Sequence, residues 1–438
     1  MKLFGRIFGT QPPPAQPAIR FGRYTESNRS AEREKAFDTA LRDFGKENYL
    51  SAYVSFFDYL LDEQEQNVRA WEEKSELRFE LFQGSKRITG FANGRKFYAE
   101  AKIAKAKTLQ SSFMRRLLEA NYELKYSRFA LTPDNEIAIV FDSYTSDGSP
   151  YKLYAALKEL AIHADKHDDI LVDEFEALEI TDFNIRRELS QAEKATKLAY
   201  IQQEIRAAFE EMDSGRLSTD QYPVAFTYLL LDLCYRLDYL TKPEGYMMET
   251  LERIDRTAFS EDGKNAAQKN LALRKEFQQL LERPIEKLGG ELYEVSATFG
   301  ITPPIDHQKV VILIDQELSN MRWYADNGHE RIAKAIPSFI IGRSLFSFAL
   351  PPPDKDLFHL LMQILEADFF RNLGFTPLVE RGVLDEKAIR QAIRQIVNKH
   401  ENAYPHLNPD LRRLVFTTMP NFAESFLMMV RELDLTMA

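Results

Sequence analysis

The chain has 438 residues, of which 44% are hydrophobic and 28% are charged, and its formal net charge is −10. This length is enough for two or three domains of ordinary size, and the composition is that of a globular protein. Such an acidic chain disfavours general nucleic-acid binding, which needs a positive field opposite the phosphates. Its single cysteine, Cys234, lies in an apolar run, which excludes a disulfide framework and a cysteine metal site and fits a reducing, cytoplasmic compartment.

The first 30 residues are basic, polar and rich in proline, and they lack the apolar core of a signal peptide. We predict a disordered tail over residues 1–30, with a short membrane-surface anchor at its start as the alternative. Further along, no run reaches the roughly 18 charge-poor residues that a membrane span requires. The nearest, residues 224–240, contains Asp232 and Arg236, which stand four residues apart and are predicted to pair on one face of a buried helix.

The pattern after the tail predicts helix followed by strand. Hydrophobic residues at helical spacing indicate helix over residues 31–61, with a break at Gly45. Three strands are then predicted from the alternation of hydrophobic and charged residues, over residues 77–81, 86–92 and 96–107. Together these strands are typical of an antiparallel meander with one face in water.

Two turns and one irregularity are predicted within this meander. Gly84-Ser85 separates the first and second strands, and Asn93-Gly94 is the strongest two-residue signal for a hairpin. In the third strand the hydrophobic alternation slips by one residue near Ala104. A β-bulge, or the end of the strand, would explain the slip.

A second set of elements follows the meander. A helix over residues 111–121 is predicted from its apolar stripe and from Asn121, which tolerates the left-handed conformation that ends helices. Two strands are predicted over residues 123–131 and 136–141. The second of these is apolar on both faces, as in a central strand. After a Ser-Pro pair, typical of a helix start, a further helix is predicted from Pro150.

The resulting order is helix, three-strand antiparallel meander, helix, two strands, helix, which is typical of an α+β sandwich. This order, and the pattern Leu117-Leu118-x-x-Asn121 with Arg128-Phe129-Ala130-Leu131, resembles the YbjN-like family and the class I type III secretion chaperones (Tir chaperone-like) over residues 31–172. The resemblance implies a domain that dimerises and has no catalytic centre, and, for the secretion chaperones, one that holds extended segments of a partner protein. The long amino-terminal segment and the large carboxy-terminal half depart from that family.

Every strong pattern from Ser218 onward is helical, and the breaks fall at a glycine pair and at proline clusters. No repeat of roughly 34 or 40 residues appears, so we predict an irregular helical bundle instead of a solenoid. Residues 336–350 fit a strand or a helix equally well. The predicted domains are an α+β domain over residues 31–182, a helical connector over 183–216 and an all-α domain over 217–438.

The histidines and glycines give no catalytic signature. His163 and His167 stand four residues apart, and on a helix they would share a face, as metal ligands often do. No HExxH pattern accompanies them, so a solvated helix end is the preferred interpretation. The spacings of a phosphate-binding loop, a dinucleotide-binding loop and a GxSxG nucleophile elbow do not occur. We therefore assign no catalytic, cofactor-binding or metal-ligating residue.

Four aromatic residues, Phe56, Phe82, Tyr98 and Tyr122, lie off the predicted buried stripes. Aromatic side chains exposed on the face or edge of a sheet can hold a partner segment that adds as a strand. These four are therefore the candidate partner-binding residues. The alternative is that they pack against the helical half.

The sequence favours a non-enzymatic, cytoplasmic protein-binding protein of chaperone or adaptor type, without a cofactor. It would bind a polypeptide partner, or form a homodimer through the sheet domain, by means of apolar patches and an unpaired sheet edge. A second hypothesis is an enzyme whose site lies in a cleft between the two domains and combines carboxylates with histidines. A third is a structural subunit of a larger assembly.

Overall fold

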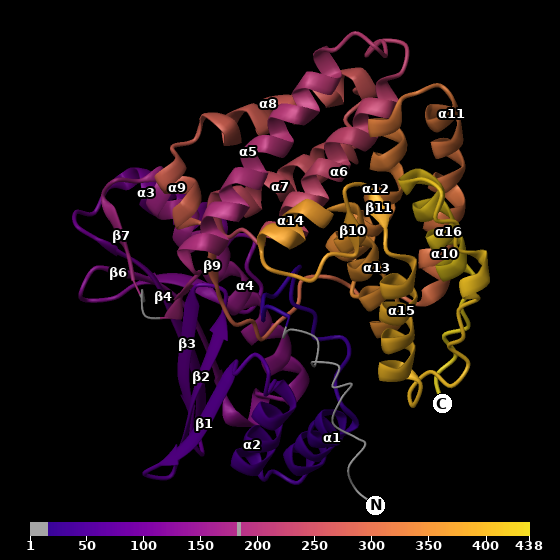
Figure 1. Ribbon diagram of the computed structural model, residues 1–438. Helices are drawn as coiled ribbons and strands as arrows, with labels where there is room; N and C mark the ends of the chain where they lie inside the picture. The colour runs from indigo at the N-terminus through magenta and orange to yellow at the C-terminus, as the bar shows by residue number, and fades with distance from the viewer. Residues whose placement is uncertain (1–15, 182–184) are drawn as a thin grey trace, which may run out of the picture.

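The structure is a computed structural model that describes residues 16–181 and 185–438, apart from the side chains of residues 168–170, 173 and 180. It contains an antiparallel sheet with covering helices in the first part of the chain and a bundle of helices in the second (Figure 1). The predicted succession of a mixed part and a helical part is confirmed, but the first part has more strands than predicted.

The first part of the chain, here called the sheet half, forms seven antiparallel strands within the residues that the structure describes. Its elements, in chain order, are α1 (Ala31–Gly45), α2 (Tyr49–Leu60), β1 (Val68–Glu73), β2 (Glu76–Gln83), β3 (Lys86–Ala92), β4 (Lys96–Ala106), α3 (Ser111–Asn121), β5 (Arg128–Leu131), β6 (Glu136–Tyr144), α4 (Pro150–Glu174) and β7 (Leu178–Ile180). The strands lie in the order β1-β2-β3-β4-β6-β5, and β7 pairs with the last residues of β4. The position of β6 between β4 and β5 confirms the predicted central strand.

The irregularity predicted in the third strand of the meander is a β-bulge in β4. Lys102 pairs with Ala138 and Ala104 pairs with Ile137, so that Ile103 is an extra residue in the ladder. Ile103 and Ala104 are both fully buried. The bulge therefore turns the strand by one residue and lets two consecutive apolar side chains enter the core.

The strand predicted over residues 123–131 is wrong in its first half, because β5 begins only at Arg128. The carboxylate of Glu159, on α4, accepts hydrogen bonds from the backbone N–H groups of Lys125, Tyr126 and Ser127 at 2.8 to 2.9 Å. These donors turn toward a side chain instead of a neighbouring strand. The alternation of residues 123–127 gave no indication of an acceptor 32 or more residues away.

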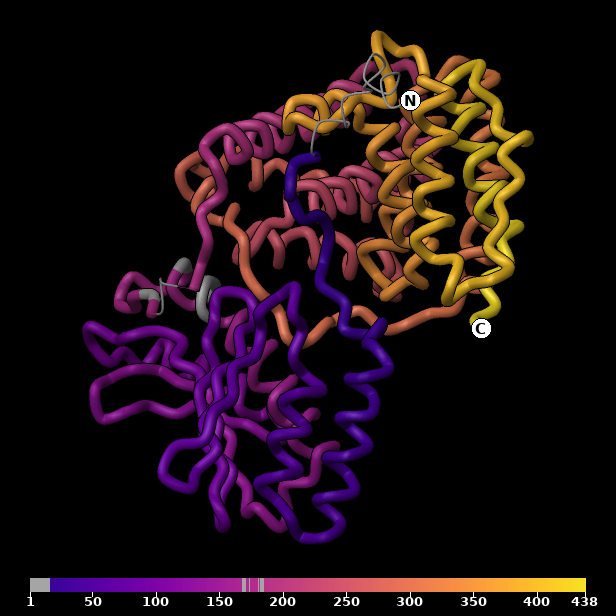
Figure 2. Tube along the Cα trace, turned by 60° about the horizontal axis from the view of Figure 1, so that its bottom comes forward, coloured from indigo at the N-terminus to yellow at the C-terminus, as the bar shows by residue number. Residues whose placement is uncertain are grey.

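One face of the sheet is covered and the other is not. Helices α2 and α4 pack on the covered face, with α1 against both of them (Figures 1 and 2). The alternating burial of β2 separates the two faces: Leu77, Phe79 and Leu81 are buried, while the intervening residues are partly exposed. This arrangement agrees with the predicted meander that has one face in water.

The second part, here called the helical half, consists in its described residues of packed helices with two short strand pairs. Its elements are β8 (Arg187–Glu188), α5 (Gln191–Asp213), α6 (Pro223–Thr241), α7 (Gly245–Ala258), α8 (Ala266–Glu282), α9 (Ile285–Gly290), β9 (Tyr293–Glu294), α10 (His307–Glu317), α11 (Met321–Asp326), α12 (Glu330–Ser347), α13 (Pro352–Leu365), α14 (Ala367–Asn372), β10 (Val379–Glu380), β11 (Val383–Leu384), α15 (Glu386–His400) and α16 (Met419–Arg431). Helix α5 buries Tyr200, Ile201 and Ile205 and packs on α6 and α8. It therefore contributes to the core of the helical half.

Helix α6 is the central element of the helical half. It packs against α12, which contains most of the segment whose pattern fitted strand and helix equally. Gly342 of α12 lies against Tyr235 of α6, where an added Cβ would be 2.8 Å from the Cβ of Tyr235. The predicted pair within α6 is confirmed, since Arg236 donates to both carboxylate oxygens of Asp232 at 3.0 and 3.1 Å. Among the described residues, no helix combines the length and apolar character that crossing a membrane requires.

Two extended segments join the halves. The amino-terminal strap, residues 16–30, runs from the α14 region across the junction to α1 (Figure 2). The return segment, residues 291–306, leaves the helical half, bonds to the β2–β3 turn through Gly84 and Ser296, and returns to α10. The prediction of disorder is therefore wrong for residues 16–30, and residues 1–15 lie outside the described part of the chain.

Candidate functional site

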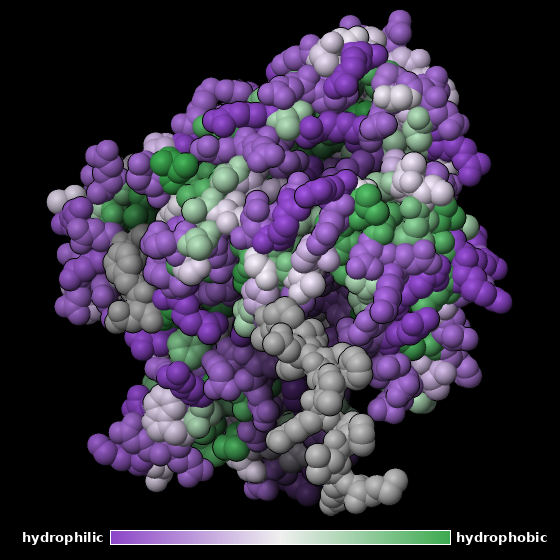
Figure 3. Space-filling model, in the orientation of Figure 1, coloured by the Kyte–Doolittle hydropathy of each residue, from purple (hydrophilic) through white to green (hydrophobic). Residues whose placement is uncertain are grey.

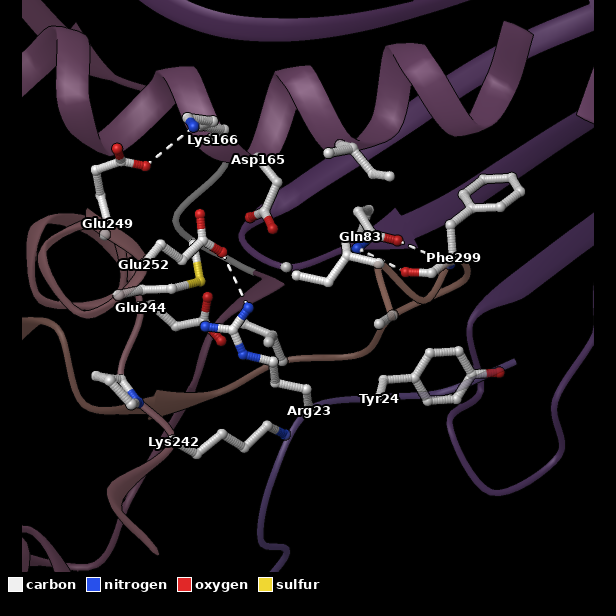
Figure 4. Close-up of a pocket in the computed structure, with 18 of the residues that line it drawn as sticks. Arg23, Tyr24, Gln83, Asp165, Lys166, Lys242, Glu244, Glu249, Glu252 and Phe299 are labelled. Carbon is white, nitrogen blue, oxygen red and sulfur yellow. Dashed lines mark hydrogen bonds and ion pairs between the residues drawn. The ribbon is translucent and has the colours of Figure 1, made fainter. Parts of the chain in front are cut away.

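A cavity of about 290 Å³ lies where the two halves meet. Its walls come from the amino-terminal strap, the β2–β3 turn, helix α4, the junction of α6 with α7, and the return segment (Figure 4). The volume is at the lower end of the range for ligand pockets, so it suits one side chain or a small molecule. The cleft that the second sequence hypothesis required is thus present.

Arg23 of the strap lies in the wall of this cavity (Figure 4). Its guanidinium donates to both carboxylate oxygens of Asp238, the shortest bond being 2.7 Å, and to Glu252 at 3.0 Å. Its guanidinium carbon is 4.1 Å from the centre of the Phe346 ring. Paired bonds of a guanidinium to a carboxylate fix position as well as charge, so Arg23 anchors the strap to α6 and α7.

The side chain of Gln83, the last residue of β2, holds the return segment against the sheet half. Its Oε1 accepts from the backbone N–H groups of Thr298 at 3.1 Å and Phe299 at 2.9 Å. Its Nε2 donates to the carbonyl oxygen of Phe299 at 3.3 Å. These bonds bring the ring of Phe299 into the core of the sheet half, edge-on to Tyr154. One wall of the cavity is thereby set by contacts between the halves.

Asp165 of α4 contributes a carboxylate that the β2–β3 turn holds in place. Its Oδ1 accepts from the backbone N–H of Ser85 at 2.9 Å. Gly84 has a φ of +53°, and an added Cβ there would lie 1.8 Å from the same oxygen. The turn therefore requires glycine both for its backbone conformation and for the space that Asp165 occupies.

Lys166 of α4 and Glu249 of α7 form an ion pair of 3.0 Å between the two halves (Figure 4). Glu249 also pairs with Arg256 at 2.6 Å. Burial raises the pKa of Glu249, but the hydrogen bonds and charges of Lys166 and Arg256 outweigh this, so its pKa lies below the usual value. Glu249 is therefore a fixed negative charge at neutral pH.

The cavity is acidic overall. Among the described residues of its wall, carboxylates outnumber cations six to three: Glu65, Asp165, Asp238, Glu244, Glu249 and Glu252 against Arg23, Lys166 and Lys242. From outside the wall, Arg20 pairs with Glu65 and Arg256 pairs with Glu249. Apolar side chains complete the wall: Ile162, Met248, Val295, Ala297, Phe299 and Ile301. A recess that is negative and partly apolar complements a cationic group on an aliphatic stem, such as the side chain of lysine or arginine.

The four aromatic residues chosen from the sequence do not converge on this cavity. Phe56 is fully buried under the sheet, so its selection as an exposed residue is wrong. Phe82 and Tyr98 lie on the uncovered face of the sheet, where the rings of Tyr98 and Phe91 stack with their centres 5.7 Å apart. Tyr122 follows α3 and is 94% exposed. The structure thus distributes the four over the core, the uncovered face and the end of a helix.

The edges of the sheet are protected against strand addition. At one edge, the side-chain amide of Asn121 accepts from the backbone N–H of Phe129 at 2.6 Å and donates to the carbonyl oxygen of Phe129 at 3.5 Å. These two bonds occupy backbone groups on the outer side of β5. At the other edge, β1 exposes Arg69, Glu72 and Glu73. Charged side chains on an edge strand oppose pairing with another chain. On the face seen in Figure 3, hydrophobic side chains gather in several separate areas on a mostly hydrophilic surface.

The histidine pair of α4 lies away from the cavity. The rings of His163 and His167 stack with centres 5.6 Å apart, and His167 lies edge-on to Phe129. Burial lowers the pKa of both, that of His167 to about 4. Within the described residues, no group of three or more His, Cys, Asp or Glu side chains is arranged to hold a metal ion. Of the described residues that line the cavity, none is a histidine.

The sequence was compared with models of protein families and with curated proteins. No family model matches the chain. No curated protein is significantly similar to it.

Proposed function

We propose that this chain is a non-enzymatic binding protein of adaptor or chaperone type, and that its cavity takes a basic side chain of a polypeptide partner. The observation that carries the proposal is the excess of carboxylates over cations in a recess with apolar walls. Lysine and arginine bury their aliphatic stems while their charged ends find carboxylates, so both parts of such a side chain are complemented. The resemblance of the sheet half to YbjN-like and secretion-chaperone proteins favours the same class of function.

The fixed charges of the wall support binding more than proton transfer. Glu249 is held ionised by Lys166 and Arg256, whereas a general acid needs a carboxyl whose pKa is raised toward neutrality. Asp165 and Asp238 already accept hydrogen bonds, from Ser85 and Arg23. Carboxylates held in this way present a preformed negative surface to a ligand.

The test is selection from a library of 12-residue peptides on the full-length protein, followed by isothermal titration of the selected peptides. We expect them to contain lysine or arginine beside apolar residues. The double change Asp165→Asn with Glu249→Gln keeps the shapes and an acceptor for Ser85 but removes two charges. It should weaken binding by about 10-fold or more, since a hydrogen bond to a charged group contributes about 1.5–3 kcal/mol.

The matched control is Glu401→Gln, which removes a charge from an exposed residue at the end of α15. It should change the affinity by less than about twofold, because exposed charges contribute little. Selected peptides without a basic residue, or equal affinities for the cavity variant and the control, would contradict the proposal.

The second candidate function is catalysis in the same cavity, which its position between the halves favours. The two functions differ in the fate of the ligand. Mass spectrometry of a selected peptide after long incubation with the protein should recover it unchanged if the cavity only binds. A cleaved or modified peptide, formed by the natural protein and not by the Asp165→Asn, Glu249→Gln variant, would favour the enzyme.

A further inference from the structure

Three consecutive residues of the amino-terminal strap, Phe21, Gly22 and Arg23, each occupy a distinct recess of the helical half. The first recess is aromatic. The ring of Phe21 lies 5.0 Å from Phe370, 5.4 Å from His359 and 5.8 Å from Phe375, measured between ring centres. Burial lowers the pKa of His359 to about 4, so its ring is neutral at pH 7 and joins an apolar wall. This recess accepts a flat aromatic side chain.

The second position admits only glycine. Gly22 has a φ of +70°, and an added Cβ would lie 2.5 Å from the ring of Tyr239. Its backbone N–H donates to the carbonyl oxygen of Tyr239 at 2.8 Å. The Tyr239 hydroxyl is itself hydrogen-bonded to His359 at 2.8 Å, so the ring is held and has little freedom to move aside. Backbone conformation, space and hydrogen bonding therefore all select glycine.

The third position selects arginine. The guanidinium of Arg23 bonds to both carboxylate oxygens of Asp238 and to Glu252, and it lies over the ring of Phe346. Its planar fork makes these bonds in a way that the point charge of lysine does not reproduce. The helical half thus carries a groove with an aromatic recess, a contact that excludes side chains, and a pair of carboxylates. Its resident ligand is the tripeptide Phe-Gly-Arg.

The same tripeptide occurs a second time in the chain. Residues 4–6 are also Phe-Gly-Arg, 17 positions before residues 21–23, and both copies are followed by a large apolar or aromatic residue, Ile7 and Tyr24. A third Phe-Gly pair, at residues 8–9, is followed by Thr10 and therefore lacks the arginine. The first 30 residues thus contain two full copies of the ligand and one incomplete copy. The other Phe-Gly pairs of the chain, at residues 44–45 and 299–300, are followed by Lys46 and Ile301 and also lack the arginine.

We propose that this groove is a recognition site for the tripeptide Phe-Gly-Arg, and that residues 4–6 of the same chain are an alternative occupant to residues 21–23. Residues 21–23 hold the groove in this structure because the contacts of Tyr24 with Asp62 and of Glu26 with Lys158 continue the strap directly onto the sheet half. Binding of residues 4–6 would instead close a loop of 17 residues, at an entropic cost that grows slowly with length. The proposal does not require the cavity to bind a basic ligand.

The experiment uses the full chain and a fluorescent peptide with the sequence of residues 19–25, Ile-Arg-Phe-Gly-Arg-Tyr-Thr. Fluorescence anisotropy is measured for the natural protein, for Phe21→Ala with Arg23→Ala, and for the quadruple variant that also carries Phe4→Ala and Arg6→Ala. The natural protein should bind least, because its groove is filled. The double variant should bind more tightly, and the quadruple variant more tightly again, by at least about threefold, because it has no internal competitor.

Two controls keep the result specific. A peptide with alanine in place of its glycine should bind the quadruple variant at least about 10-fold more weakly. The further change Phe370→Ala removes part of the aromatic recess without touching the cavity lining and should abolish peptide binding. Circular dichroism and size-exclusion chromatography establish that each variant is folded, and amide exchange of the α6 backbone gives a second reading of groove occupancy.

Each outcome decides a part of the proposal. Failure of the folded quadruple variant to bind the peptide, or equal binding of the glycine and alanine peptides, would overturn the recognition site. Equal affinities of the double and quadruple variants would overturn residues 4–6 as the second occupant. Dimers of the double variant that disappear in the quadruple variant would overturn the same-chain assignment, because residues 4–6 would then occupy the groove of a neighbouring copy.

Discussion

The side-chain amide of Gln83 and the backbone of Phe299 bind each other reciprocally across 216 residues of sequence, through bonds of 2.9 and 3.3 Å. The same amide accepts a third bond, from Thr298. All of these groups are buried. One glutamine at the end of β2 therefore holds a segment of the helical half in the core of the sheet half.

The change Gln83→Ala should destabilise the protein by about 3 kcal/mol, because it leaves two buried N–H groups and a carbonyl oxygen without partners. We expect the midpoint of thermal unfolding, followed by circular dichroism, to fall by several degrees. Backbone amides of Thr298 and Phe299 should also lose protection against hydrogen exchange. The control is Gln279→Ala on the exposed face of α8; an equal loss of stability in the control would refute the role given to Gln83.

The change Gly84→Ala should destabilise the protein and disturb the cavity, whereas Gly94→Ala should be nearly neutral. A Cβ on Gly84 would meet the carboxylate of Asp165, and the backbone at Gly84 has a positive φ that disfavours alanine. A Cβ on Gly94 would have no atom of the described residues within 4 Å. We expect the free energy of unfolding, measured by chemical denaturation, to fall by at least about 1–2 kcal/mol for Gly84→Ala only. Two variants of equal stability would show that Asp165 is not held against the turn.

Glu159 should make the stability of the sheet half depend on pH. Burial raises its pKa, but hydrogen bonds from Lys125, Ser127 and Tyr126 outweigh this, so the pKa in the folded protein lies below the usual 4.5. Its contribution is therefore present above about pH 4.5 and is lost as the pH falls through the lower, folded-state pKa.

The free energy of unfolding of the Glu159→Gln variant should be about 1–2 kcal/mol lower than that of the natural protein at pH 7. At pH 3 the difference should be smaller, and urea unfolding at several pH values across this range measures it. Glu174→Gln, at the exposed end of the same helix, is the control. A constant difference between Glu159→Gln and the natural protein at every pH would argue against the role of the charge.

Replacement of Arg236 should lower the stability of the helical half strongly. Arg236 is 5% exposed and bonds to Asp232, Glu204 and the hydroxyl of Tyr200. Its replacement by methionine leaves buried carboxylates without their cation and should cost about 3–5 kcal/mol at pH 7.5. Arg206→Met, at an exposed position of α5, should have little effect.

Acid should partly rescue the Arg236→Met variant. Burial already raises the pKa of Asp232 to about 6 in the natural protein, against the opposing charge of Arg236. Without that charge the carboxyl is harder to ionise, so the folded variant binds protons that the unfolded chain does not, and its stability rises as the pH falls toward 5. The urea midpoints of the Arg236→Met variant at pH 7.5 and 5.5 measure this rise in stability. A variant that is less stable at pH 5.5 than at pH 7.5 would contradict the prediction.

The predictions that succeeded rest on local physics. The slip near Ala104, the start at Pro150 and the pair Asp232–Arg236 each depend on residues within a few positions of one another. Helix α3 also ends at Asn121 as predicted, but Asn121 is not left-handed and its amide bonds to the backbone of Phe129. Strand β1 was missed because it is a short edge strand whose charged residues do not alternate. Phe56 was misjudged because it was placed off the apolar stripe of α2, although it stands three residues after Tyr53 and four before Leu60, on the same buried face.

The sequence by itself determined the antiparallel sheet with a wet face and the helical remainder, because hydrophobic period and turn chemistry act over short distances. Only the tertiary structure decided the cavity and the groove, since Arg23, Gln83 and Asp165 acquire their partners from segments 80 to 229 residues away. A polar side chain has no periodicity that identifies a distant partner. Its role follows from which backbone and charges the packed halves bring to it.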